Sequence, residues 1–292
     1  MLRELADAFI VFSLFSFLGW IFESVFCSIS ERRFINRGFL NGPACPIYGA
    51  GGLIAWYALA PIEGDLALFA AGAVGCSIVE YVTSWAMEKA YHARWWDYSD
   101  RFLNLNGRVC VPATLLFGTF SYLIARVMKP LVESVLRTWP DAASLCIAGT
   151  LAAIFAVDLA VTHIGLSGFR DKVDGYCDQL THRASELYAA FSESDGVIAR
   201  GVRMAQEGPV GRAYVRVREM MPGPVAIEDV GYDLAKSFQA ALNRQEQRVL
   251  AAFPEARVKM PKLPKLPHLP KVPSVGEVLE RARTMRDNLV GK

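Results

Sequence analysis

The stretch ASLCIAGTLAAIFAVDLAVTHIGLS, from Ala143 to Ser167, decides the fold class. It is longer than the roughly 20 apolar residues that cross the hydrocarbon core of a bilayer as an α-helix. Asp158 is the only Asp, Glu, Lys or Arg in the stretch. It lacks the alternation of a half-buried strand, and only helices and closed barrels satisfy their backbone groups in lipid. The stretch therefore predicts a transmembrane helix.

Four further apolar stretches approach this length, so we predict five spans in all. The other four are Ala8–Ile29, Cys45–Ile62, Leu66–Met87 and Val109–Val127. The one that begins at Cys45 is shorter than the rest and rich in glycine. The composition agrees with a membrane protein, because 53% of the 292 residues are hydrophobic. We expect an all-α, polytopic bundle over residues 1–168, followed by a soluble, helical and Pro-rich C-terminal tail.

The Lys and Arg residues of the short loops predict the orientation, because cytoplasmic loops carry an excess of them. The loops after the first and third predicted spans are basic, and the loop after the second has no Lys or Arg. This alternation favours an outside N-terminus and a cytoplasmic tail in the cell membrane. The region around the fourth connection does not follow the pattern, since it contains Arg126, Lys129 and Arg137.

The tail divides by composition into residues 169–255 and 256–292. The first part contains an apolar spacing typical of an amphipathic helix, in Ile227, Val230, Leu234, Phe238 and Leu242. The second part begins with a repeat in which proline occupies every third position of PKLPKLPHLPKVP. Three residues make one turn of polyproline II, so this strip is either a stiff spacer or a ligand for a partner groove or membrane surface.

The end of the tail is strongly basic. Its last 37 residues, from Ala256, hold 9 basic and 3 acidic side chains, and an amphipathic helix is predicted after the proline strip. Such a segment is typical of contact with anionic lipid headgroups. Nucleic acid is not expected as a partner, because no recognition motif accompanies the charge.

Three acids fall inside predicted spans: Glu23, Glu80 and Asp158. An ionisable group there costs on the order of 2.5–3.5 kcal/mol on insertion scales, which makes each a candidate functional residue. One hypothesis is a polar cavity that binds a cation or cationic group, or acids that carry protons. The alternative is structural, in which nearby arginines neutralise the acids; the candidates are Arg37, Arg94 and Arg108.

The six cysteines are scattered and form no C-x-x-C pair, which favours buried or lipid-facing thiols over a metal site. We expect no metal and no cofactor. No nucleophile motif and no G-x-x-x-x-G-K-[ST] phosphate loop occur in the chain. We therefore predict no catalytic residues and no enzyme activity.

Two loop segments are dense in Gly, Pro, Asn and aromatic residues, which predicts shaped rather than free loops. The run FLGWIFESVFCSISERRFINRGFLNGPACPIYGAGG, Phe17–Gly52, resembles the start of the CmpB-like family of ABC-transporter permeases. The segment RWWDYSDRFLNLNGRVCVPATLLFG, Arg94–Gly118, resembles a second signature of that family. The matching positions are Trp20, Glu23, Asn36, Arg37, Gly38, Pro43, Pro46, Tyr48, Gly49, Trp96, Asp97, Tyr98, Ser99, Asn106, Gly107 and Arg108.

The resemblance implies a permease subunit that works with a separate ATP-binding subunit, since this chain has no phosphate loop. Five spans make a small permease, which favours a homodimer or a further subunit. Two other hypotheses stay open. One is a membrane anchor or regulator that acts through its basic tail. The other is a membrane-embedded enzyme for lipid headgroups that uses Glu23, Glu80, Asp97 and His163 as acids or bases.

Overall fold

The computed structural model describes residues 1–179, 181–183, 186, 234, 236–253 and 256–258. The chain divides into two compact units. One comprises Met1–Phe169 and Asn243–Arg257, and the other comprises Arg170–Leu242 and Val258–Lys292. The predicted proline strip, the basic terminal helix and most of the predicted amphipathic helix near residues 227–242 lie outside the described residues.

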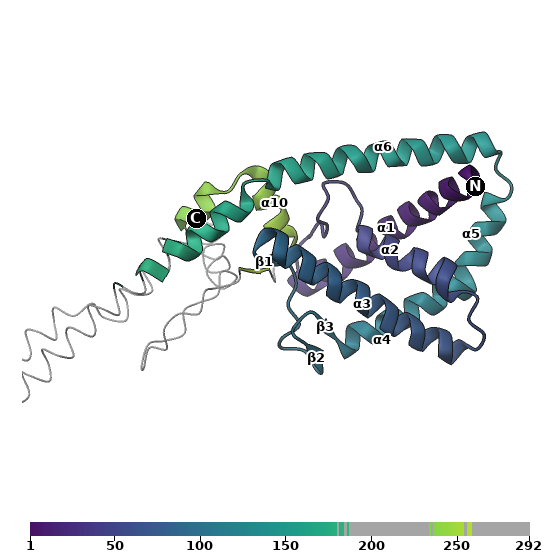
Figure 1. Ribbon diagram of the computed structural model, residues 1–292, viewed down its shortest axis with the longest axis horizontal. Coiled ribbons are helices and arrows are strands. Elements are labelled where there is room, and N and C mark those ends of the chain that lie inside the picture. The colour runs from purple at the N-terminus through teal and green to yellow at the C-terminus, as the bar shows by residue number, and fades with distance from the viewer. Residues whose placement is uncertain (180, 184–185, 187–233, 235, 254–255, 259–292) are drawn as a thin grey trace, which may run out of the picture. The chain divides into compact units, whose positions relative to one another are not determined.

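The first unit is mostly helical (Figure 1). Its helices are α1 (Leu2–Glu31), α2 (Pro46–Leu53), η1 (Ile54–Leu59), α3 (Asp65–Tyr91), α4 (Val111–Leu123), η2 (Ile124–Met128), α5 (Lys129–Leu136), α6 (Asp141–Leu166) and α10 (Arg244–Ala252). The short strands of the chain are β1 (Ala93–Arg94), β2 (Asn104–Leu105), β3 (Val109–Cys110) and β4 (Arg257–Val258). Strands β2 and β3 form an antiparallel hairpin in which Leu105 lies opposite Val109.

Four helices of the described residues are long and apolar enough to cross a membrane. They are α1, α3, the continuous helix Val111–Leu136 and the helix that begins at Asp141. They confirm the predicted helical membrane protein and correspond to predicted spans one, three, four and five. The predicted second span is α2 and η1 instead, and at about 1.5 Å per residue its helical part is too short to cross a core of about 30 Å. The count of five crossings stays a prediction.

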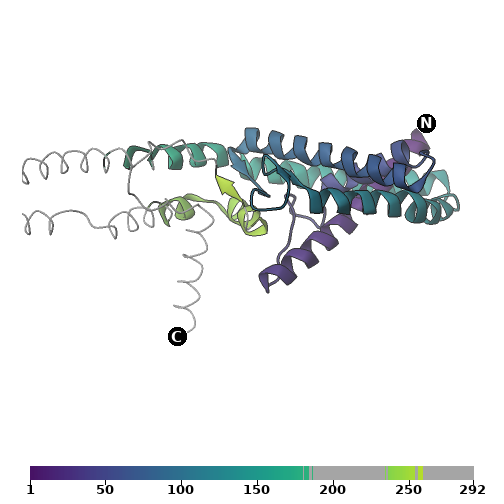
Figure 2. The same cartoon turned by 90° about the horizontal axis from the view of Figure 1, so that it is seen from below.

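The helices of this unit run between two ends. Figures 1 and 2 show α1, α3 and α6 running in one direction and α4 in the opposite direction. Met1 and α5 lie at one end, which we call the Met1 end. The β2–β3 hairpin and α10 lie at the other, which we call the hairpin end. Helix α3 packs along α4, and α1 packs against both α2 and α6.

Glycines let α1 and α2 approach closely. A side chain at Gly49 would overlap the Ser16 hydroxyl and the Phe12 carbonyl of α1, and one at Gly52 would overlap the Phe15 ring. In the other direction, a side chain at Gly19 of α1 would overlap Tyr48. The glycine richness of the predicted second span therefore reflects a tight helix–helix contact.

A proline explains the irregular turn within the Val111–Leu136 helix. Pro130 has no backbone N–H and cannot donate to the carbonyl of Arg126, four residues earlier. The preceding turn, η2 (Ile124–Met128), widens into a π-helix, which places the missing bond in a local bulge. The helix then continues as α5 to Leu136, whose side chain is buried in a core cluster with Ile10, Phe15 and Trp56.

Basic side chains close the Met1 end by binding backbone carbonyls. Arg3 donates to the carbonyls of Leu136 and Trp139 at 2.7 and 3.0 Å. Arg126 donates to the carbonyls of Ala60 and Ile62 at 3.0 and 2.7 Å. These basic groups satisfy helix ends and turns, which have no intrahelical partners for their last carbonyls.

The second unit has its own aromatic contact. The rings of Tyr176 and Phe238 lie with their centroids 4.8 Å apart. Both residues belong to this unit and both are buried. Val173 of this unit is buried as well.

Candidate functional site

The most unusual part of the first unit is the chain between α1 and α2. We call residues 33–45 the entry segment; it contains no helix and no strand. Its last residue, Cys45, donates its N–H to the Ser16 carbonyl in the middle of α1 at 2.9 Å. Irregular backbone is tolerated at membrane depth only where protein or a polar environment satisfies its N–H and C=O groups.

Asp158 of α6 binds the N–H groups of the entry segment. Its two carboxylate oxygens accept from the backbone N–H of Asn41 at 2.8 Å and of Gly42 at 2.7 Å. The Asn41 side-chain amide donates to Asp158 at 3.1 Å and to the Thr162 hydroxyl at 2.9 Å. Among the described residues, Asp158 forms no ion pair within 4.0 Å. Asp158 therefore binds backbone N–H groups rather than an arginine.

Arg248 of α10 binds the carbonyl groups of the same segment. Its guanidinium donates to the carbonyls of Phe39 at 2.7 Å, Leu40 at 2.9 Å and Gly38 at 3.4 Å. Burial lowers the pKa of Arg248 from its usual value, and the charge of Asp158 acts in the opposite sense. Asp158 thus accepts from N–H groups of the entry segment, and Arg248 donates to carbonyl groups of the same segment.

Two capping contacts position α10 for this role. Asn243 and Glu246 form a reciprocal capping box at its N-terminus. The Asn243 side-chain amide also donates to the Gly165 carbonyl near the end of α6 at 2.8 Å. Glu246 and Val249 are fully buried. Helix α10 therefore packs within the same compact unit as the predicted spans.

Arg37 joins the entry segment to both α1 and α10. Its Nε lies 3.5 Å from Glu23 Oε2, and one terminal nitrogen donates to the Ala252 carbonyl at 3.2 Å. Its guanidinium stacks 4.5 Å from the centroid of the Phe253 ring. Its backbone N–H donates to the Ser24 hydroxyl at 3.1 Å. The predicted pairing of an arginine with an intramembrane acid is present at Glu23.

Two tyrosine–carboxylate contacts lie beside this pair. Tyr48 of α2 donates its hydroxyl to Glu23 Oε1 at 2.5 Å, and Tyr98 donates to Glu80 Oε1 of α3 at 3.1 Å. Burial, followed by the charges of Glu80 and Glu23, raises the pKa of Tyr98 well above its usual value. Tyr98 therefore stays a hydrogen-bond donor. The two carboxylates are close enough for their charges to interact.

The two carboxylates differ in how completely they are satisfied. Glu23 accepts from Tyr48 and pairs with Arg37. Glu80 is 6% exposed, and its Oε2 is buried with no hydrogen-bond partner among the described residues. No arginine of the described chain pairs with Glu80, because Arg94 and Arg108 bind other acids.

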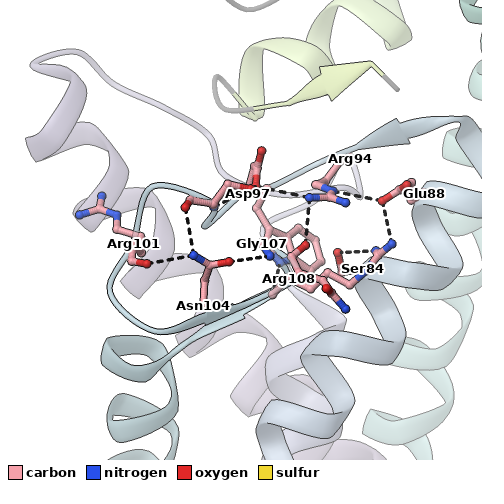
Figure 3. Close-up of polar contacts among 11 residues, drawn as sticks. Ser84, Glu88, Arg94, Asp97, Arg101, Asn104, Gly107 and Arg108 are labelled. Carbon is pink, nitrogen blue, oxygen red and sulfur yellow. Dashed lines mark hydrogen bonds and ion pairs between the residues drawn. The ribbon is translucent and has the colours of Figure 1, made fainter. Parts of the chain in front are cut away.

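Those two arginines converge on Glu88, just beyond the predicted third span. Glu88 lies 3.1 Å from Arg94 and 2.9 Å from Arg108. Figure 3 shows it paired with both arginines. Arg108 also donates to the Ser84 hydroxyl at 3.2 Å, and Arg94 lies 3.4 Å from Asp97. The network fastens the loop between α3 and α4 to the last turns of α3.

A second set of bonds shapes the loop itself. Asp97 accepts from the Ser99 N–H at 3.0 Å and from the Ser99 hydroxyl at 2.5 Å. Asn104 donates to the carbonyls of Ser99 and Arg101 and accepts from the Gly107 N–H at 3.0 Å (Figure 3). Gly107 has a φ of 67°, and a side chain there would overlap Asp97 and Ser99. The glycine is required by both conformation and space.

Several of the remaining predicted positions contact neighbouring parts of the chain. Asn36 accepts from the Trp20 indole N–H at 2.7 Å, and Pro46 occupies the first turn of α2. The Trp96 indole donates to the Arg108 carbonyl at 3.3 Å. Asn106 donates to the Tyr81 hydroxyl at 3.0 Å. Pro43 is exposed.

Sequence reasoning missed the partners of these residues. Three of these partners are polar residues within or near the recognised segments: Glu88, Ser84 and Asn41. Their capacity for hydrogen bonding was the sequence signal that could have identified them. Arg248 had no such signal, because it is one of many basic residues in the tail. No group of three or more His, Cys, Asp or Glu that could hold a metal ion gathers in the part of the chain that the structure describes.

Comparison with known families gives one match. The family described as "Putative ABC-transporter type IV" matches residues 10–163, which include both segments described above. The chain belongs to this family. The match begins within α1, includes most of α6 and stops before α10, so Arg248 lies outside the family region. No curated protein and no solved structure matches the chain.

Family membership and the apolar helices together identify a multi-pass membrane protein of a transporter family. The family resemblance of the sequence is thereby confirmed. Two groups of residues in this family region contain the three predicted intramembrane acids. One is the entry segment with Asp158, and the other is the pair Glu23 and Glu80 with its two tyrosines.

Proposed function

We propose that this chain is the permease subunit of an ABC-type transporter and works with a separate ATP-binding subunit. The observation that carries the proposal is the entry segment, where irregular backbone inside the bundle is satisfied by Asp158 on one side and Arg248 on the other. Interrupted membrane elements of this kind are typical of transporters, in which they line the path of the solute. Family membership supports the same proposal.

We infer that the entry segment, α2 and η1 together make the second of five crossings. Helix α1 ends at the hairpin end, and α3 begins at the Met1 end (Figure 1). The chain between them must lead from one end of the bundle to the other. Irregular backbone covers the first part of this path, which explains why the helical part alone is too short to be a span.

We propose that the Met1 end faces outside and the hairpin end faces the cytoplasm of the cell. The basic residues of the fourth connection were the exception to this orientation in the sequence. In the structure Arg126 binds the carbonyls of Ala60 and Ile62, and Lys129 binds the carbonyl of Trp56 at 2.9 Å. Since these side chains bind carbonyls at helix ends, they are weaker evidence against an outside location of the fourth connection.

Further parts of the proposal follow from the sequence. The tail would lie in the cytoplasm, with its basic end on anionic lipid headgroups. A homodimer, or assembly with a further subunit, would supply the additional helices that a small permease requires. The protein would reside in the cell membrane.

The test is purification of the full-length tagged protein from native membranes after mild crosslinking, followed by mass spectrometry. We expect a stoichiometric protein with a G-x-x-x-x-G-K-[ST] loop, since this chain has none. An Arg248→Gln variant provides a matched comparison that separates binding through the bundle from binding that depends on α10. Reproducible capture of the intact protein without an ATPase would contradict the proposal.

A second candidate function is a membrane anchor or regulator that acts through the tail. The observation that favours it is the packing of α10 within the spanning unit, where Arg37 donates to the Ala252 carbonyl. A partner bound to the tail would therefore be linked to the bundle through α10. Deletion of residues 256–292 should then abolish function while the bundle stays inserted, and unchanged function would exclude this role.

A further inference from the structure

We propose that Glu80 is a reversible proton-binding site inside the bundle, coupled through Tyr98 to the loop between α3 and α4. Glu80 is 6% exposed and lies in the second half of α3. Its Oε1 accepts from the Tyr98 hydroxyl at 3.1 Å. Its Oε2 is buried and has no hydrogen-bond partner among the described residues. This oxygen is the place where the ligand would bind.

The surroundings of Glu80 offer no compensating charge. Its neighbours on the packed elements are the Glu23 carboxylate of α1, the Tyr98 hydroxyl of the loop and the Cys76 thiol of its own helix. None of these is a cation, and the nearby Arg37 is already paired with Glu23. A buried carboxylate without a positive partner is costly, and a second negative charge adds repulsion.

Titratable groups one contact further away do not change this balance. Tyr48 donates to Glu23, so it serves the other carboxylate. Cys110 interacts with Tyr98 rather than with Glu80. Arg108, which stacks near Tyr81 of α3, is bound to Glu88 and Ser84. Arg37 and Arg108 are therefore already paired with other acids.

The donor set fits a proton better than a metal ion. Hard cations such as calcium take six to eight oxygen ligands, usually with several carboxylates. The described residues hold no group of three or more His, Cys, Asp or Glu at suitable positions. One free carboxylate oxygen is sufficient for a proton. Glu80 takes it from hydronium, which forms one O–H bond and releases a water molecule.

Protonation of Glu80 would weaken the hydrogen bond that joins α3 to the loop between α3 and α4. When Glu80 is ionised, Tyr98 donates a charge-assisted hydrogen bond, which is roughly twice as strong as a neutral one. When Glu80 carries the proton, that bond is a neutral one and weaker. Tyr98 is fixed in the loop because its N–H donates to the Gly107 carbonyl at 2.8 Å. Protonation would therefore loosen the attachment of the β2–β3 hairpin to α3.

This inference deepens the proposed function, because a proton bound inside the bundle could accompany or drive transport. This inference rests on the proposed function only for the biological role of the proton. The binding of the proton is a property of this chain alone and can be measured without an ATPase or a solute. Failure of one idea therefore leaves the other testable.

The experiment is infrared difference spectroscopy of the full-length protein in lipid nanodiscs, between a neutral and an alkaline buffer, because exposed carboxyl groups, with pKa values of about 4, stay ionised in both. We expect a carbonyl band of a protonated carboxylic acid that disappears in Glu80→Gln. The matched control is Glu63→Gln, which makes the same substitution at an exposed acid outside the helices and should leave the band in place. A wild-type spectrum without the band, or a band that survives in Glu80→Gln, would overturn the proposal.

A second variant serves in case Glu80→Gln does not fold. Tyr98→Phe removes the only donor to Glu80 among the described residues and leaves the acid in place. The carbonyl band should then shift in frequency, since its hydrogen bond is lost. A band at an unchanged frequency would show that the protonated acid is not Glu80.

Discussion

Asp158 illustrates how a single intramembrane acid can be structural. Its two oxygens receive two adjacent backbone N–H groups, a geometry that only a carboxylate can match with both oxygens accepting. In Asp158→Asn the amide nitrogen would face an N–H group. We expect the protein to lose roughly 1.5–3 kcal/mol of stability, the usual cost of hydrogen bonds to a charged group. The measurement is the thermal unfolding midpoint of the purified protein in detergent.

The control for that variant is Glu63→Gln, which also removes one negative charge but at an exposed position outside the helices. It should leave the unfolding midpoint unchanged. Equal effects of the two substitutions would mean that net charge, rather than the bonds to Asn41 and Gly42, determines the stability.

Gly107 gives a prediction about conformation. Its φ of 67° lies in the left-handed region, and a side chain there would overlap the Asp97 carboxylate and the Ser99 hydroxyl. Gly107→Ala should therefore destabilise the loop by about 1–3 kcal/mol. Hydrogen exchange at the β2–β3 amides should accelerate. Gly149→Ala is the matched control, because no atom lies within 4 Å of the added methyl group and α6 should tolerate it.

At the scale of elements, the long apolar runs could be predicted from the sequence because hydropathy and length alone specify them. Helices α1, α3 and α6 and the helix Val111–Leu136 follow the predicted spans closely. The second span could not be divided into entry segment and helix, because Asn41 and Gly42 depend on Asp158, far away in the sequence. The residue pattern within one segment does not show which distant residue that segment will contact.

The packing of α10 is a second feature that could not be predicted from the sequence. Arg248 binds carbonyls that are more than 200 positions away in the chain, and nothing nearby distinguishes it from other tail arginines. The two signature loops were recognisable because their Gly, Pro and Asn residues satisfy local geometry. Their long-range partners, Glu80 for Tyr98 and Glu23 for Tyr48, became visible only in the folded chain.

The contact between α1 and α2 yields a prediction at this scale. Gly49→Ala would place a methyl group against the Ser16 hydroxyl and the Phe12 carbonyl, which is backbone and cannot move alone. Overpacking of this kind usually costs about 1–3 kcal/mol. We expect a lower unfolding midpoint in detergent. Gly75→Ala in α3 is the control, since its methyl group would meet open space; a similar loss in both variants would indicate a general intolerance of alanine.

At the scale of the whole molecule, the number of crossings determines which loops share a side of the membrane. If the entry segment, α2 and η1 cross together, the N-terminus and Glu63 face the same side. If they do not cross, α1 separates these two positions. Arg101, in the loop between α3 and α4, lies across α3 from Glu63 in either case, which provides an internal reference.

Epitope tags at the N-terminus, after Glu63 and after Arg101 therefore decide the topology. Both insertion sites are exposed, and Gly64 beside the first has open space around it. We expect antibody to reach the first two tags in intact cells and the third only after permeabilisation. The reason is that the extended part of residues 33–45 supplies the path length that the helix Pro46–Leu59 lacks. Accessibility of only one of the first two tags would reduce the crossings to four and make the entry segment a re-entrant loop.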